Sequence, residues 1–114
     1  MTDTDPDPVT VWGGNNWSNL TITTAGKIVN FQAGVTQTVY GIPAFSNNVS
    51  LLSTATWYLQ KLPGSETQDV GVVTVQYSNA TNGWTFRAPR GSTDNGDNVN
   101  WIFLKPAGTL FLLR

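Results

Sequence analysis

The sequence predicts an all-β protein, an antiparallel β-sandwich or small jelly roll of about 8–10 short strands. Apolar and polar residues alternate over many short stretches, which is the period of a strand with one buried face. Gly, Pro and Asn-Gly turn signals interrupt these stretches at short intervals. Five Trp, five Phe and three Tyr among 114 residues provide aromatic side chains for a core, which argues against a disordered chain.

The chain begins with a segment in which Asp alternates with Pro, up to Pro8. Such a segment is too polar to pack and its prolines favour extended backbone, so residues 1–8 are predicted to be a flexible, extended lead-in. Residues 9–114 are predicted to form a single β-domain. No internal repeat of about 20–50 residues is apparent, which favours a single domain.

Alternation is clearest over five stretches, from which strands are expected: Leu20–Thr23, Val29–Ala33, Val73–Tyr77, Trp84–Ala88 and Val99–Leu104.

Two antiparallel hairpins are expected from the turn signals. Val70–Tyr77 should pair with Trp84–Ala88, because Asn82-Gly83 ends the loop between them and both residues tolerate positive φ. Trp101–Leu104 should pair with Leu110–Leu113 across a loop that contains Pro106 and Gly108.

The segment Ser50–Leu62 fits two patterns. Its apolar residues match a helical stripe that Pro63-Gly64 would end, whereas Thr54, Thr56 and Trp57 favour a strand. We interpret it as a strand.

Composition excludes several classes of function. Cys and His are both absent, which removes disulfides, thiolate chemistry and the commonest zinc ligand and general base. Six basic residues and a net charge of −1 do not provide the basic surface that nucleic-acid binding requires. No apolar run approaches the length of a membrane span, so no membrane insertion is expected. With no catalytic motif, we expect neither an enzyme nor a bound cofactor or metal.

Trp12 and Trp17 flank the run Gly13-Gly14-Asn15-Asn16. Indole rings stack on the apolar faces of sugars and amides bind hydroxyl groups, so Trp12, Asn15, Asn16 and Trp17 are the first candidates for a glycan site. The alternative is that one or both Trp residues anchor the core.

Arg87 and Arg90 are the next candidates, because a guanidinium group suits acidic sugars or phosphate. The alternative for Arg87 is an ion pair with Asp94 or Asp97. These two acids lie in the run Asp94–Asn98, which also resembles a calcium loop in ligand type, although Asn-Gly and Asp suffice for a turn.

An uncharged polar surface, the alternating strands and an apolar C-terminal stretch together resemble the compact β-domains at the heads of bacteriophage and viral fibres, spikes and tail needles. The resemblance implies a virion-surface structural domain that binds a host-surface glycan or protein, and a homotrimer. Leu110–Leu113 would hold that trimer partly together, because these side chains alternate to both faces of one strand. The alternatives are a free, extracellular lectin or carbohydrate-binding module, and a virion decoration protein without a ligand.

Overall fold

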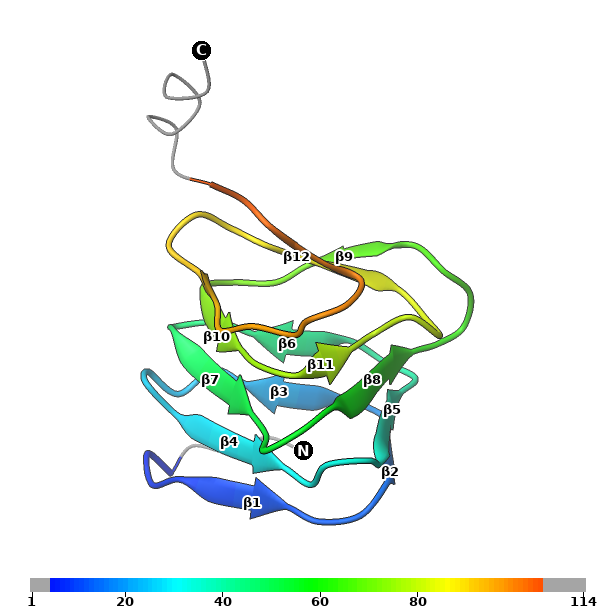
Figure 1. Cartoon of the computed structure of the whole chain (residues 1–114), viewed down its shortest axis with the longest axis horizontal. Coiled ribbons are helices and arrows are strands. Elements are labelled where there is room, and N and C mark those ends of the chain that lie inside the picture. The colour runs from blue at the N-terminus through cyan, green and yellow to red at the C-terminus, as the bar shows by residue number, and fades with distance from the viewer. Residues whose placement is uncertain (1–4, 106–114) are drawn as a thin grey trace.

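The computed structural model describes residues 5–105, which contain fourteen β-strands and no helix. The all-β prediction is therefore confirmed. The antiparallel sandwich or jelly roll is wrong, as is the estimate of about 8–10 strands: the strand pairs of the described chain are parallel, and the chain winds into a β-solenoid of about four turns (Figure 1).

The strands stack into three faces along the solenoid axis (Figure 1). The first face contains β1 (Val9–Val11), β4 (Ile28–Phe31), β7 (Val49–Leu52), β10 (Val73–Val75) and β13 (Thr93–Asp94). The second face contains β2 (Asn15–Trp17), β5 (Thr36–Val39), β8 (Trp57–Lys61) and β11 (Ser78–Asn79). The third face contains two separate sheets: β3 (Leu20–Ile22) with β6 (Pro43–Phe45), and β9 (Thr67–Asp69) with β12 (Thr85–Ala88) and β14 (Trp101–Phe103).

The chain therefore does repeat, but its coils differ in length. Along the first face the residues in register are Val9, Val29, Leu51, Val75 and Asp94, so successive coils contain 20, 22, 24 and 19 residues. The expectation of a chain without a repeat is wrong because the corners between strands vary in length, which shifts equivalent residues out of any fixed period.

The expected hairpin across Asn82-Gly83 does not form. β10 pairs with β7 and β13, and β12 pairs with β9 and β14, all in parallel. The segment Ser50–Leu62 covers β7 from its second residue and all of β8, so the strand interpretation is confirmed. The second expected hairpin and the C-terminal contact through Leu110–Leu113 fall outside the described residues.

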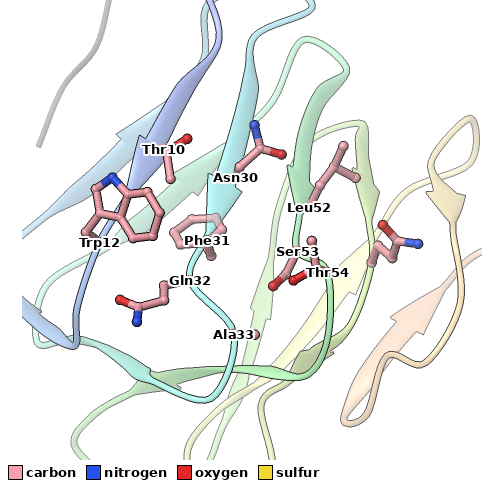
Figure 2. Close-up of a pocket in the computed structure, with 10 residues that line it drawn as sticks. Thr10, Trp12, Asn30, Phe31, Gln32, Ala33, Leu52, Ser53 and Thr54 are labelled. Carbon is pink, nitrogen blue, oxygen red and sulfur yellow. The ribbon is translucent and has the colours of Figure 1, made fainter.

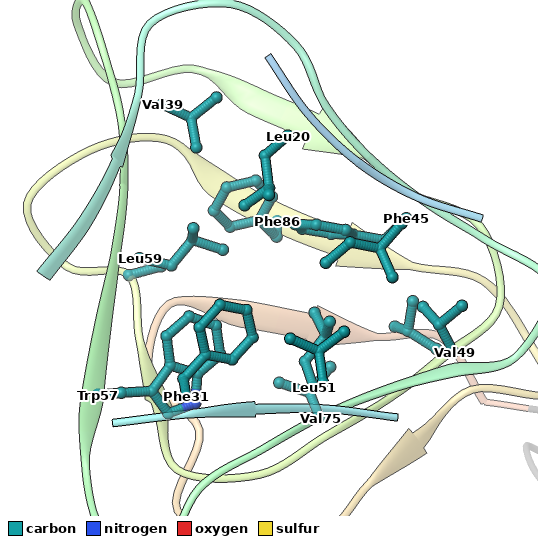
Figure 3. Close-up of a cluster of buried hydrophobic side chains, with 14 of the residues drawn as sticks. Leu20, Phe31, Val39, Phe45, Val49, Leu51, Trp57, Leu59, Val75 and Phe86 are labelled. Atoms are coloured by element: carbon teal, nitrogen blue, oxygen red, sulfur yellow. The ribbon is translucent and has the colours of Figure 1, made fainter. Parts of the chain in front are cut away.

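Apolar side chains from all three faces point inward and form one core (Figure 3). Trp57 is completely buried and stacks on Phe31, with ring centroids 3.9 Å apart and planes 7° from parallel. Nearer the C-terminal coil, Phe86 stacks on Trp101, and Trp101 on Phe103. Strands alternate apolar-in and polar-out because successive side chains of a strand point to opposite sides.

Polar side chains inside the solenoid are bound to backbone carbonyls or to one another. Gln37 is buried; its Nε2 donates to the carbonyl of Gly13, and its Oε1 accepts from Trp17 Nε1. Lys27 is also buried and its Nζ donates to the carbonyls of Asp5 and Asp7. The described part of the lead-in, though exposed, is thus tied to the second coil.

Within residues 5–105 the structure has no helix long and apolar enough to span a bilayer.

Candidate functional site

A groove of about 460 Å³ lies on the outer side of the first face and at the corner that follows it (Figure 2). Its size is within the usual range for small-molecule sites. Ten described residues line it, from four successive coils: Thr10, Trp12, Asn30, Phe31, Gln32, Ala33, Leu52, Ser53, Thr54 and Gln76. None of these ten is charged.

Trp12 forms one wall of the groove. It follows directly after β1, where Val11 points into the core, so alternation turns the indole outward. The side chain is 73% exposed, the most exposed of the large hydrophobic residues in the described chain. Gly13, at φ +74°, then turns the chain toward the second face. A large aromatic face is therefore open to solvent beside the groove.

Amide and hydroxyl groups line the rest of the groove. Asn30 and Thr10 lie side by side in register on the outer side of the first face. Gln32 Oε1 accepts a hydrogen bond of 2.6 Å from the backbone N–H of Gly13, which fixes the corner next to Trp12. Gln76 and Thr54 come from later coils. These groups can both donate and accept hydrogen bonds without carrying charge.

Ser53 is the exceptional residue of the groove. It comes directly after β7, is 9% exposed, and its Oγ is buried with no hydrogen-bond partner in the described structure. Figure 2 shows Ser53 beside Thr54. Ser53 is in register with Phe31 and Val11, whose side chains point into the core, so its unpaired Oγ lies behind the groove wall.

The structure separates the residues of the first predicted cluster. Trp12 lines the groove, but Trp17 is half-buried, packs against the core and donates through Nε1 to Gln37 at 2.9 Å. Asn15 Nδ2 donates to the carbonyls of Trp12 and Gly13, so this amide holds the corner. Asn16 is exposed on the outer side of the second face.

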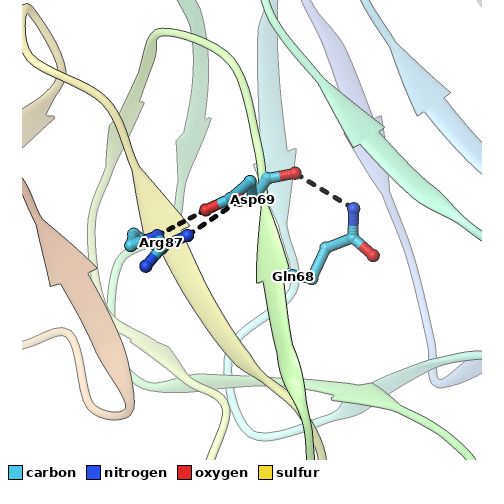
Figure 4. A network of polar contacts seen from close by, with 3 residues as sticks. All are labelled: Gln68, Asp69 and Arg87. Atoms are coloured by element: carbon cyan, nitrogen blue, oxygen red, sulfur yellow. Dashed lines mark hydrogen bonds and ion pairs between the residues drawn. The ribbon is translucent and has the colours of Figure 1, made fainter.

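Arg87 lies on β12 in the third face, away from the groove. Its guanidinium group makes a bidentate ion pair with Asp69 on the adjacent strand β9 (Figure 4). The hydrogen bonds lower the pKa of Asp69 and raise that of Arg87. The expected partners Asp94 and Asp97 were wrong, because parallel pairing places β9 beside β12. Arg90 is exposed in the turn after β12.

The run Asp94–Asn98 forms a turn. Asp94 Oδ1 accepts from the backbone N–H of Gly96 and from Asn98 Nδ2, and that Nδ2 also donates to the carbonyl of Val75. Over the described ranges, no three acidic residues gather into a group that could hold a metal ion.

Local motif reasoning missed Asn30, Gln32, Ser53, Thr54 and Gln76, because they join Trp12 only through the stacking of coils. The signal that could have found them is register: Gln32 lies one coil after Trp12, and Thr54 one coil after that. Comparison of the chain with family models, curated proteins and solved structures found no match.

Proposed function

We propose that this β-solenoid binds an uncharged glycan in the groove beside Trp12. The observation that carries the proposal is the combination of an open indole face with uncharged amides and hydroxyls in a groove of ligand size. Sugars present an apolar ring face for stacking and a rim of hydroxyls for hydrogen bonding, and this groove offers partners for both.

The uncharged lining favours a neutral sugar, because amides and hydroxyls can pair with sugar hydroxyls without a charged partner. An acidic sugar fits less well, because no described residue of the lining carries a positive charge to pair with it. Arg87, the candidate for acidic sugars, is already paired with Asp69.

The biological setting of this binding rests on the resemblance to virion fibre and spike heads. In that setting the groove would bind a host-surface glycan, and the domain would belong to a homotrimer at the virion surface. A free lectin would use the same groove and the same contacts. A decoration protein without a ligand is disfavoured by the open indole beside the groove.

The test is a binding screen of the full chain against immobilised neutral glycans of hexose and N-acetylhexosamine units, with sialylated and uronic-acid glycans alongside. We expect binding to neutral members of the set. Trp12→Ala should weaken it at least tenfold, which corresponds to a loss of about 1.4 kcal/mol. Tyr40→Ala is the matched control, since Tyr40 is 56% exposed and is not part of the groove lining. Absence of neutral-glycan binding, or equal losses in both variants, would overturn the proposal.

A further inference from the structure

The groove runs along the solenoid axis. Thr10 pairs with Asn30, Asn30 with Leu52, and the backbone N–H of Gln76 donates to Leu51, so these four side chains form one outward row across four coils. Neighbouring strands lie about 4.8 Å apart, which makes the row roughly 14 Å long.

The features that favour a sugar lie at different heights along the solenoid axis. Trp12 belongs to the first coil and Gln76 to the fourth. Three strand spacings separate them along the axis, about 14 Å. A single sugar ring stacked on Trp12 is too short to reach Gln76.

We infer that the groove binds a linear, uncharged oligosaccharide extended along the solenoid axis, with one unit on Trp12 and a later unit at Gln76. This inference rests on the proposed glycan binding. Leu52, in the same coil as Ser53, offers an apolar contact for the ring face of a later unit. Repeating units of the ligand thus lie against repeating coils of the protein.

An extended peptide is the other linear polymer to consider. Peptides that join a β-protein usually pair with a sheet edge through backbone hydrogen bonds. Here the groove lies on the outer side of a sheet and is lined by side chains, with β4 and β7 already paired on both sides. The geometry therefore favours a ligand that binds through its own hydroxyls.

The experiment is isothermal titration of the full chain with homologous series of neutral oligosaccharides, from monomer to hexamer. The series are β-1,4-linked glucose, mannose and N-acetylglucosamine, and α-1,4-linked glucose. For a series that binds, we expect the Kd to fall at least tenfold from the monomer to the tetramer and then to level off. Addition of units beyond the end of the groove should bring no further gain.

Variants at the two ends of the groove show where the oligosaccharide lies. Trp12→Ala should weaken every member of the series, whereas Gln76→Ala should weaken the tetramer at least threefold and leave the dimer unchanged. Gln60→Ala is the matched control, because Gln60 is an outward amide of the second face that is not part of the groove lining.

The possible outcomes separate this inference from the proposed function. If a monosaccharide binds as tightly as the tetrasaccharide and its binding depends on Trp12, the proposed axial placement of an oligosaccharide is overturned but glycan binding remains. Equal losses for dimer and tetramer in Gln76→Ala would overturn the axial placement too. Failure of all series, together with failure of the wider neutral-glycan screen, would refute glycan binding itself. Binding of an extended neutral peptide to the same groove, without any sugar binding, would replace the ligand class.

Discussion

Replacing Ser53 by Ala should make the protein more stable. A buried hydroxyl without a partner costs about 1–3 kcal/mol in the folded state, and Ser53 Oγ is such a group. Alanine removes that oxygen and leaves a void of roughly 15 Å³, which costs about 0.4 kcal/mol at about 24 cal/mol per Å³. The expected net gain in the free energy of unfolding is about 0.6–2.6 kcal/mol.

Ser78→Ala is the matched control for this prediction. Ser78 is buried too, but its Oγ accepts a hydrogen bond of 3.0 Å from Trp101 Nε1. Removing this acceptor leaves the indole N–H unpaired, so the same substitution should cost about 1 kcal/mol here. Two serines of similar burial are therefore expected to change stability in opposite directions.

Urea unfolding followed by tryptophan fluorescence measures both changes, and an unchanged m-value would show that the same surface unfolds in each protein. A clear loss of stability in Ser53→Ala would refute the reasoning, because it would mean that Oγ has a partner within the chain. Titration with a neutral tetrasaccharide gives the second readout. Because Ser53 Oγ is buried behind the groove wall, Ser53→Ala should bind the tetrasaccharide as tightly as the unaltered chain.

Three further predictions concern other parts of the chain. Asp69→Asn should lower the Tm at neutral pH, because Arg87 depresses the folded-state pKa of Asp69. The Tm difference between the two proteins should close as the pH falls below about 4, and a Tm difference independent of pH would contradict the ion pair. Gly41→Ala should cost about 1–3 kcal/mol in urea unfolding, since its Cβ would lie 1.9 Å from the carbonyl oxygen of Ser18, and unchanged stability would contradict that close approach. Light scattering should find the full chain as a trimer and a chain lacking residues 109–114 as a monomer or as insoluble material; a full-length monomer at micromolar concentration would contradict the trimer.

The sequence predicted the strands better than their partners. Leu20–Ile22 and Val29–Phe31 alternate as expected and are strands, because alternation reports only which face of a strand is buried. The direction of pairing leaves little trace in that pattern. Asn82-Gly83 is typical of a hairpin loop, but the same residues serve equally well at the corner of a coil, and Gly83 lies there against the backbone of Lys61.

The candidate site was found in part for the same reason. Trp12 was accessible to sequence reasoning because an aromatic residue next to Gly-Gly is suited to an exposed turn. Trp17 was not distinguishable from it, since only the fold shows that Gln37 receives its indole N–H. Gln32 and Ser53 lie about one and two coils further along the chain, and the unequal coil lengths conceal that relation from any search at a fixed spacing.

Because the coils stack in parallel, the length of the groove depends on the number of coils. Each strand of the first face pairs only with the strands of the neighbouring coils, so stability in such folds is close to a sum of coils and their interfaces. Duplication of the coil that carries Asn30 and Gln32 would lengthen the groove by about 4.8 Å and add one more amide row, without disturbing the ends. Gain or loss of single coils is therefore a route by which evolution or design could match this surface to longer or shorter polymers.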